Sequence, residues 1–189
     1  EARLRGNSVY FPDRAIPMLP ERLSGDLCSL RPDVDRLVLV VEMAFDERGE
    51  RDRTRFYRAV VRSRARLTYE QAAAAIEQDD DTIAQAPMLR DLARLTRLLG
   101  ERRRAAGSLD FELPSAEFTL DERGFPVDVG PAARNRAHRA IEEAMLAANR
   151  AVAEWLVEHE VEAVHRVHEP PAPPDLERLT TELIALGLV

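Results

Sequence analysis

The helix predicted over residues 133–158 carries three polar side chains that can hold a loop or bind a sugar. At about 100° per residue, His138, Glu142 and Asn149 fall within about 40° of one another and form one polar strip. A histidine, a carboxylate and an amide beside an apolar face are costly unless they are partnered. Two interpretations stay open: the strip holds a neighbouring loop by hydrogen bonds, or it grips a sugar hydroxyl.

Aromatic and basic side chains in the first third of the chain offer a second kind of chemistry. Tyr10 lies beside Phe11 on a predicted strand over residues 6–12, where an exposed ring can stack on a base. The residue types alone favour a half-buried core tyrosine. Four arginines recur at even positions of a later predicted strand and therefore share one face: Arg58, Arg62, Arg64 and Arg66.

Two groups of acidic residues are of a type that binds metal ions, but their positions in the sequence do not favour a metal site. Asp79, Asp80 and Asp81 are consecutive on a loop, so their carboxylates point in different directions. Mg²⁺ requires octahedral oxygen ligands on a fixed frame. We interpret the triplet as a solvated loop that places negative charge before a helix. Asp33 and Asp35 precede a strand and are predicted to be turn residues.

Cysteine and histidine do not predict a site. Cys28 is the single cysteine, and a catalytic cysteine needs a histidine close to it in space, which the sequence does not show. We interpret Cys28 as a small buried residue. A cysteine–histidine hydrolase is a functional hypothesis that depends on Cys28 alone. His165 and His168 are three residues apart on a predicted strand, so they face opposite sides and make a poor zinc chelate.

The elements that carry these residues mix strands and helices. Strands are predicted over residues 6–12, 36–46, 53–66, 109–113, 116–120, 125–129 and 161–167. Helices are predicted over residues 68–78, 87–106, 133–158 and 175–185, with a short turn or helix over 24–30. No strict βαβ alternation is present, so the predicted class is α+β, with an antiparallel hairpin sheet packed against long helices.

Caps and apolar spacing support the helices. Thr68 is predicted to cap the first long helix, with Gln71 at the capping-box position. Asp175 is predicted to cap the last one. The buried face of the longest helix is predicted from apolar residues at helical spacing: Ile141, Met145, Ala148, Val152 and Trp155.

Composition bounds the class of protein. The chain has 189 residues, 45% hydrophobic and 32% charged, which suits one packed domain. A single cysteine excludes a disulfide framework. No apolar run approaches the roughly 18 residues that span a bilayer, and no signal peptide is visible, so we expect a cytoplasmic protein with no membrane partner. The net charge of −7 argues against a surface that is basic all round. All 27 basic residues are arginine, the better ligand for phosphate.

Several longer segments of the sequence are informative when they are taken together, in their order along the chain. The first is RGNSVYFPDRAIPMLPERLS at residues 5–24, followed by DLCSL at 26–30. The later ones are RFYRAVVRS at 55–63, LDFELP at 109–114, AHRAIEEAMLAAN at 137–149 and RVHEPP at 166–171. In this order they resemble the catalytic (RNB) domain of the ribonuclease II / ribonuclease R family. The resemblance spans nearly the whole chain.

This resemblance implies a processive 3′→5′ exoribonuclease that releases nucleoside 5′-monophosphates from single-stranded RNA. In the family, clustered aspartates bind two magnesium ions that activate water and stabilise the leaving oxygen. Tyr10 matches the tyrosine that stacks on the terminal nucleotide, which reverses its interpretation as a core residue. Glu142 or Glu143 matches a glutamate that contacts the 3′-terminal nucleotide, and the helical geometry favours Glu142. A grip on the 2′-hydroxyl would distinguish RNA from DNA.

The resemblance also bounds what this chain can do. The RNA-binding residues that we predict are Tyr10, Arg58, Arg62, His138, Glu142, Glu143 and Asn149. The family's aspartate cluster precedes the first segment and its catalytic arginine follows the last. We therefore expect residues 1–189 to be an internal part of a single RNB catalytic domain, truncated at both ends, with no catalytic residue or metal ligand of its own. Mg²⁺ is expected in the full-length enzyme.

The expected partners are single-stranded RNA, not DNA, and the remainder of the same polypeptide with its cold-shock and S1 domains. The alternative is a non-catalytic RNA-binding or scaffold protein that kept the RNB fold and lost the metal site.

Overall fold

The computed structural model describes residues 2–78, 80–109, 116–132 and 134–187. The chain divides into two compact units, Glu1–Glu154 and Trp155–Val189, which are described separately. Within the described residues, none of the helices combines the length and the apolar character that crossing a membrane requires.

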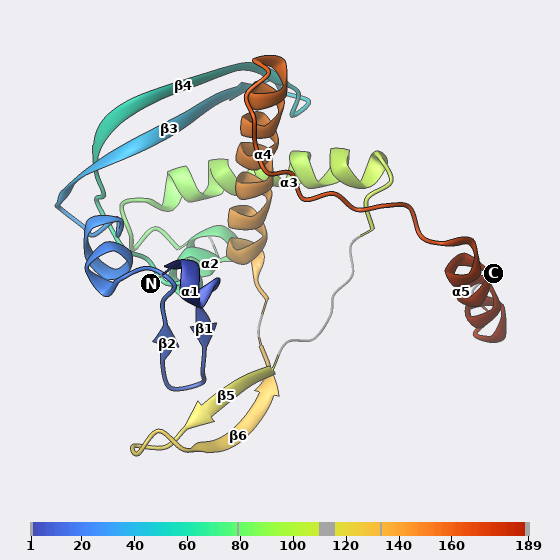
Figure 1. The fold of residues 1–189 in the computed structure, drawn as a ribbon. Coiled ribbons are helices and arrows are strands. Elements are labelled where there is room, and N and C mark those ends of the chain that lie inside the picture. The colour runs from blue at the N-terminus through green and yellow to red at the C-terminus, as the bar shows by residue number, and fades with distance from the viewer. Residues whose placement is uncertain (1, 79, 110–115, 133, 188–189) are drawn as a thin grey trace. The chain divides into compact units, whose positions relative to one another are not determined.

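The strands form three antiparallel hairpins (Figure 1). They are β1 (Val9–Tyr10) with β2 (Ala15–Ile16), β3 (Asp35–Phe45) with β4 (Arg51–Arg62), and β5 (Ala116–Leu120) with β6 (Pro126–Pro131). The helices are α1 (Ala2–Arg5), a π-helical segment η1 (Arg22–Leu27), α2 (Tyr69–Glu77), α3 (Ala86–Ala105), α4 (Arg136–Glu158) and α5 (Pro173–Ala185). The predicted mixture of antiparallel strands and helices is thus confirmed.

Local sequence signals set several of these boundaries. The Thr68 hydroxyl accepts a hydrogen bond from the backbone N–H of Gln71 at 3.2 Å, and the Gln71 side chain accepts one from the Thr68 N–H at 2.9 Å. This is the predicted capping box of α2. The β3–β4 hairpin turns at Asp46, whose carboxylate accepts hydrogen bonds from the N–H groups of Arg48 and Glu50.

Two predicted strands and one predicted helix cap differ in the structure. The strand over 6–12 shrinks to Val9–Tyr10 paired with β2, because Pro12 and Pro17 lack an N–H for the ladder. The strand predicted over 161–167 is wrong: these residues are exposed and irregular, and no strand of the described residues pairs with them. Ala172, not Asp175, is the N-cap of α5, since prolines favour the first helical positions. The strand predicted over 109–113 falls mostly outside the described residues.

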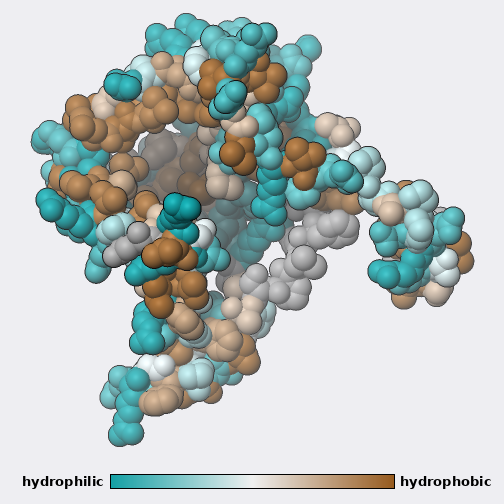
Figure 2. Space-filling view, in the orientation of Figure 1, coloured by the Kyte–Doolittle hydropathy of each residue, from teal (hydrophilic) through white to brown (hydrophobic). Residues whose placement is uncertain are grey.

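The β3–β4 hairpin leaves one face open. Leu37 lies opposite Val60, and Leu39 lies opposite Arg58, so the four side chains share a face. Leu37 is 87% and Leu39 70% exposed, and Figure 2 shows apolar residues along the hairpin.

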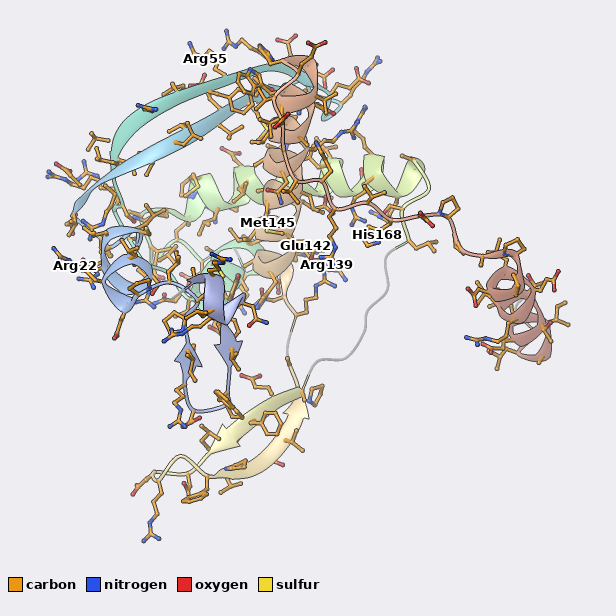
Figure 3. All side chains as sticks on the ribbon, viewed as in Figure 1. Arg22, Arg55, Arg139, Glu142, Met145 and His168 are labelled. Atoms are coloured by element: carbon orange, nitrogen blue, oxygen red, sulfur yellow. The ribbon has the colours of Figure 1, made fainter. Side chains whose placement is uncertain are left out.

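The other face of the hairpin carries a polar network. Arg55, labelled in Figure 3, donates to Glu42 at 2.6 Å, and the Tyr57 hydroxyl donates to the same carboxylate at 2.9 Å. These hydrogen bonds lower the pKa of Glu42, that from Tyr57 contributing most.

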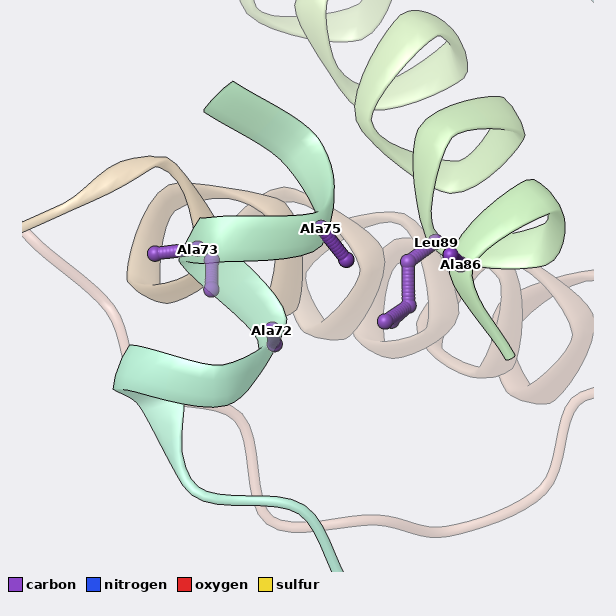
Figure 4. Packing of buried hydrophobic residues seen from close by; sticks show 6 residues of the cluster. Ala72, Ala73, Ala75, Ala86 and Leu89 are labelled. Atoms are coloured by element: carbon purple, nitrogen blue, oxygen red, sulfur yellow. The ribbon is translucent and has the colours of Figure 1, made fainter. Parts of the chain in front are cut away.

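The core is small and made mostly of alanine. It lies where α2, α3 and the start of α4 meet (Figure 4). Its buried members are Ala72, Ala73, Ala75, Ala86, Leu89 and Ala137. Small side chains let helix backbones approach closely, so this junction fixes the three helices relative to one another.

The buried face of α4 is not the one predicted. Ile141 and Met145 are about half exposed, whereas Ala137, Ala140 and Ala151 are buried. Alanines also occupy positions 144 and 147, so the packed face is an alanine stripe at helical spacing. Apolar size was therefore a misleading signal for this helix.

Candidate nucleic-acid interface

The two adjacent glutamates of α4 have different surroundings. Glu143 accepts hydrogen bonds from Arg103 of α3, at 3.1 Å from Nε and 2.8 Å from Nη2, and its side chain is only 12% exposed. A side chain at Gly100 would come within 3.3 Å of the Glu143 carboxylate, so the glycine makes room for this ion pair. Glu143 therefore joins α3 to α4.

Glu142 is the more accessible of the pair. Its side chain is 39% exposed and forms an ion pair with Arg134, which precedes α4. Figure 3 shows Arg139, Glu142 and Met145 following one another along α4. A surface carboxylate in an exposed ion pair is easily released to another partner, because such pairs contribute little stability.

His138 holds the beginning of α4. Its ring stacks on Tyr69 of α2 with centroids 3.7 Å apart, and its Nδ1 lies 2.8 Å from the side-chain oxygen of Asn135. That oxygen also accepts hydrogen bonds from the N–H groups of Ala137 and His138, as an N-cap does. Of the two interpretations of the polar strip, these contacts match the first for His138.

The remaining predicted contact residues lie on β1, α4 and β4. Tyr10 on β1 is 80% exposed, so its interpretation as a half-buried core residue is wrong. Asn149 is exposed on α4. On β4, Arg62 donates to Asp35 at 2.6 Å, and this hydrogen bond lowers the pKa of the Asp35 carboxyl. Arg58 is exposed on the same face as Leu39. Arg64 and Arg66 lie beyond the end of β4.

A basic pocket between α3 and α4 is the feature that the sequence prediction missed. It has a volume of about 570 Å³. Eight arginines line it: Arg90, Arg94, Arg97, Arg103, Arg104, Arg134, Arg136 and Arg139. Glu142 and Glu143 are its two acidic lining residues.

A sequence signal for this pocket exists. Arg90, Arg94, Arg97 and Arg104 are spaced by four, three and seven residues. At this helical spacing their side chains form one stripe on α3. The contribution of α4 depends on the tertiary structure alone.

The other candidate residues have local roles or exposed positions. The interpretation of Cys28 as buried is wrong, because it is exposed at the C-cap of η1. Asp80 accepts from the Thr82 N–H, which lowers the Asp80 pKa, and Asp81 pairs with Arg90. Asp79 lies outside the described residues. Within the described part of the chain, no three side chains of His, Cys, Asp or Glu lie together as metal ligands would.

Comparison with known proteins gives a consistent result. A family model of the RNB domain matches residues 1–187. Ribonuclease R of Aquifex aeolicus is 46% identical over 191 residues, covering 99% of this chain and 27% of that protein. The chain thus spans about a quarter of the length of this curated relative.

Solved structures resemble this fold as well. Mycoplasma genitalium RNase R in complex with ribose methylated single-stranded RNA has a TM-score of 0.93 and 30% identity, covering 100% of this chain and 30% of that chain. Yeast Ssd1, described as a pseudonuclease, has a TM-score of 0.74 and covers 98% of this chain and 23% of that chain; at 20% identity this likeness concerns the fold alone. Because the RNB family model matches nearly the whole sequence, this chain belongs to the RNB family.

Proposed function

We propose that this chain is the substrate-binding middle portion of a processive, magnesium-dependent 3′→5′ exoribonuclease that degrades single-stranded RNA to nucleoside 5′-monophosphates. The observation that carries the proposal is the match to RNase R bound to single-stranded RNA, which covers the whole of this chain. Both compact units are assigned to one RNB catalytic domain, because the family model extends across them.

Each predicted contact residue has a role in this proposal. Tyr10 stacks on the terminal nucleotide, for which its exposed ring is suited. Glu142 accepts from the ribose 2′-hydroxyl, with Asn149 further along the helix, whereas Glu143 keeps α3 and α4 together. His138 positions the start of α4. Arg58 and Arg62 contact phosphates along β4.

The metal ion and the partner domains belong to the finer part of the proposal. The family resemblance implies Mg²⁺, which would activate water and stabilise the leaving oxygen. The described residues do not group as a metal site, so no step is assigned to a metal ion held by them. The cold-shock and S1 domains of the same polypeptide would guide RNA, and the cytoplasm is the proposed location.

The test uses the full-length protein that contains this chain, with Mg²⁺ and a 5′-labelled single-stranded oligoribonucleotide. Stepwise shortening from the 3′ end with release of nucleoside 5′-monophosphates is expected, and Glu142→Ala should slow it. Glu122→Ala, in the exposed β5–β6 turn, is the matched control. The same oligodeoxyribonucleotide should persist. The isolated chain is expected to have no magnesium-dependent nuclease activity.

A non-catalytic RNA-binding or scaffold protein is the second candidate. A protein described as a pseudonuclease has the same fold, so this fold does not require catalysis. RNA binding by the full-length protein without any shortening of the oligoribonucleotide would favour this candidate over the exoribonuclease.

A further inference from the structure

The lining of the basic pocket between α3 and α4 contains eight arginines and two glutamates. Four of its arginines pair with acids: Arg90 with Asp81, Arg97 with Glu101, Arg103 with Glu143, and Arg134 with Glu142. Glu77 brings a fifth acid to the edge, where it accepts from the Arg136 backbone N–H at 2.9 Å. Among the described residues, these contacts give an acid partner to the side chains of four of the eight lining arginines.

Three guanidinium groups of the pocket are available to a ligand. The contacts of the described residues give no acid partner to the side chains of Arg94, Arg104 and Arg136. All three residues are exposed. Clustered like charges repel one another, so a cluster of this kind is stabilised when an anion enters it. Guanidinium presents a planar set of donors that matches two phosphate oxygens at once.

The lining also indicates which part of a ligand is recognised. The pocket lining also contains the small residues Ala93, Thr96, Gly100 and Ala140, and none of the described lining residues is aromatic. A site without rings cannot stack on bases, so it recognises phosphates and not base sequence. A volume of about 570 Å³ exceeds what a single phosphate needs and suits a ligand with several linked groups.

We propose that this pocket binds consecutive backbone phosphates of RNA, independently of base sequence, through Arg94, Arg104 and Arg136. The proposal rests on the RNA-binding part of the proposed function and adds three arginines that lie outside the sequence segments on which the family resemblance depends. Free polyanions such as pyrophosphate carry the same chemistry, so the test separates the two sources.

The experiment compares the whole chain with two triple variants of equal charge change. The pocket variant is Arg94→Gln, Arg104→Gln and Arg136→Gln. The control is Arg48→Gln, Arg123→Gln and Arg178→Gln, which are exposed and lie in hairpin turns or on α5. Binding of fluorescein-labelled single-stranded oligoribonucleotides of two different sequences is followed by anisotropy between about 50 and 200 mM salt. Circular dichroism checks that all three proteins are folded.

The pocket variant should bind about tenfold more weakly at low salt, and its slope of log K against log salt should fall by about 2, for three lost phosphate contacts on a single strand. The control should change both quantities by less than half as much, and both RNA sequences should behave alike. Equal losses in the two variants, or no loss in either, would overturn the proposal.

A pyrophosphate arm identifies the ligand source. If the wild-type chain binds pyrophosphate, the pocket variant loses this binding, and RNA binding is unchanged, then the pocket is a site for free phosphates and the RNA proposal is wrong. If the wild-type chain does not bind RNA at all, the RNA-binding part of the proposed function fails instead. Normal RNA binding that the pocket variant leaves unchanged would contradict only the inference about the pocket.

Discussion

Glu143 of α4 and Arg103 of α3 form an ion pair in which two guanidinium nitrogens, at 3.1 and 2.8 Å, donate to the same carboxylate oxygen. The neighbouring Glu142 points to Arg134 instead. Consecutive residues of a helix are separated by about 100°, so one carboxylate joins two helices while the next remains accessible. The division of roles between these two glutamates underlies the following prediction.

Replacing Glu143 should destabilise the fold. Glu143→Gln removes the carboxylate charge that pairs with the partly buried Arg103, and a loss of about 1–3 kcal/mol in the free energy of unfolding is expected. Urea unfolding followed by circular dichroism measures it. Glu122→Gln in the exposed β5–β6 turn should change the free energy by less than about 0.5 kcal/mol. Equal stability of the two variants would show that the Arg103 ion pair does not hold α3 to α4.

Tyr10 should contribute to RNA affinity and not to stability. Because its ring is 80% exposed, Tyr10→Ala is expected to leave the unfolding midpoint unchanged. Loss of base stacking should weaken oligoribonucleotide binding by the full-length protein by about 1–3 kcal/mol. Tyr10→Phe keeps the ring and should bind nearly as the wild type does. If Phe is as weak as Ala in this anisotropy measurement, the ring does not stack on a base.

Acid should weaken the contact between the β3–β4 hairpin and α4. Arg51, at the start of β4, and Arg150 donate to Glu154, and these hydrogen bonds lower the pKa of its carboxyl below the usual 4.5. Because this pKa is lower in the folded chain than in the unfolded one, the stabilisation is complete above about pH 4.5 and is lost as the pH falls through the lowered value.

Glu154→Gln tests this pH dependence. The free energy of unfolding should fall less between about pH 7 and about pH 3 in the variant than in the wild type, because the variant has no carboxyl to titrate there. Glu122→Gln, whose carboxylate lies in an exposed turn, should keep the wild-type dependence. An unchanged pH profile in Glu154→Gln would remove the ion pair as a source of acid sensitivity.

The capping box of α2 should stabilise the helix junction. Thr68→Ala removes the hydroxyl that accepts from the Gln71 N–H, and a loss of about 1 kcal/mol is expected. Thr68→Ser restores the hydroxyl and should recover most of this loss in a thermal melt. A serine variant no more stable than the alanine variant would indicate that packing of Thr68, and not its hydrogen bond, matters.

Local rules predicted the elements better than their packing. The capping box of α2 involves neighbours in sequence, so side-chain chemistry was sufficient to predict it. The strand prediction for residues 161–167 was wrong because a strand also needs a neighbouring strand to pair with. The β-branched residues of this segment carry no information about such a neighbour. The predicted buried face of α4 was wrong because large apolar side chains were expected to be buried, whereas the buried residues of this helix are alanines.

The sequence by itself determined the family resemblance. Through that resemblance it also determined the candidate RNA-binding residues, among them Tyr10, Glu142 and Glu143. Only the tertiary structure separated Glu143 from Glu142, because the distinction depends on Arg103, forty residues away in sequence. It also assembled the arginine pocket from α3 and α4. Charges on different helices become neighbours only when an alanine-rich junction packs the helices together, and no spacing within one helix encodes that contact.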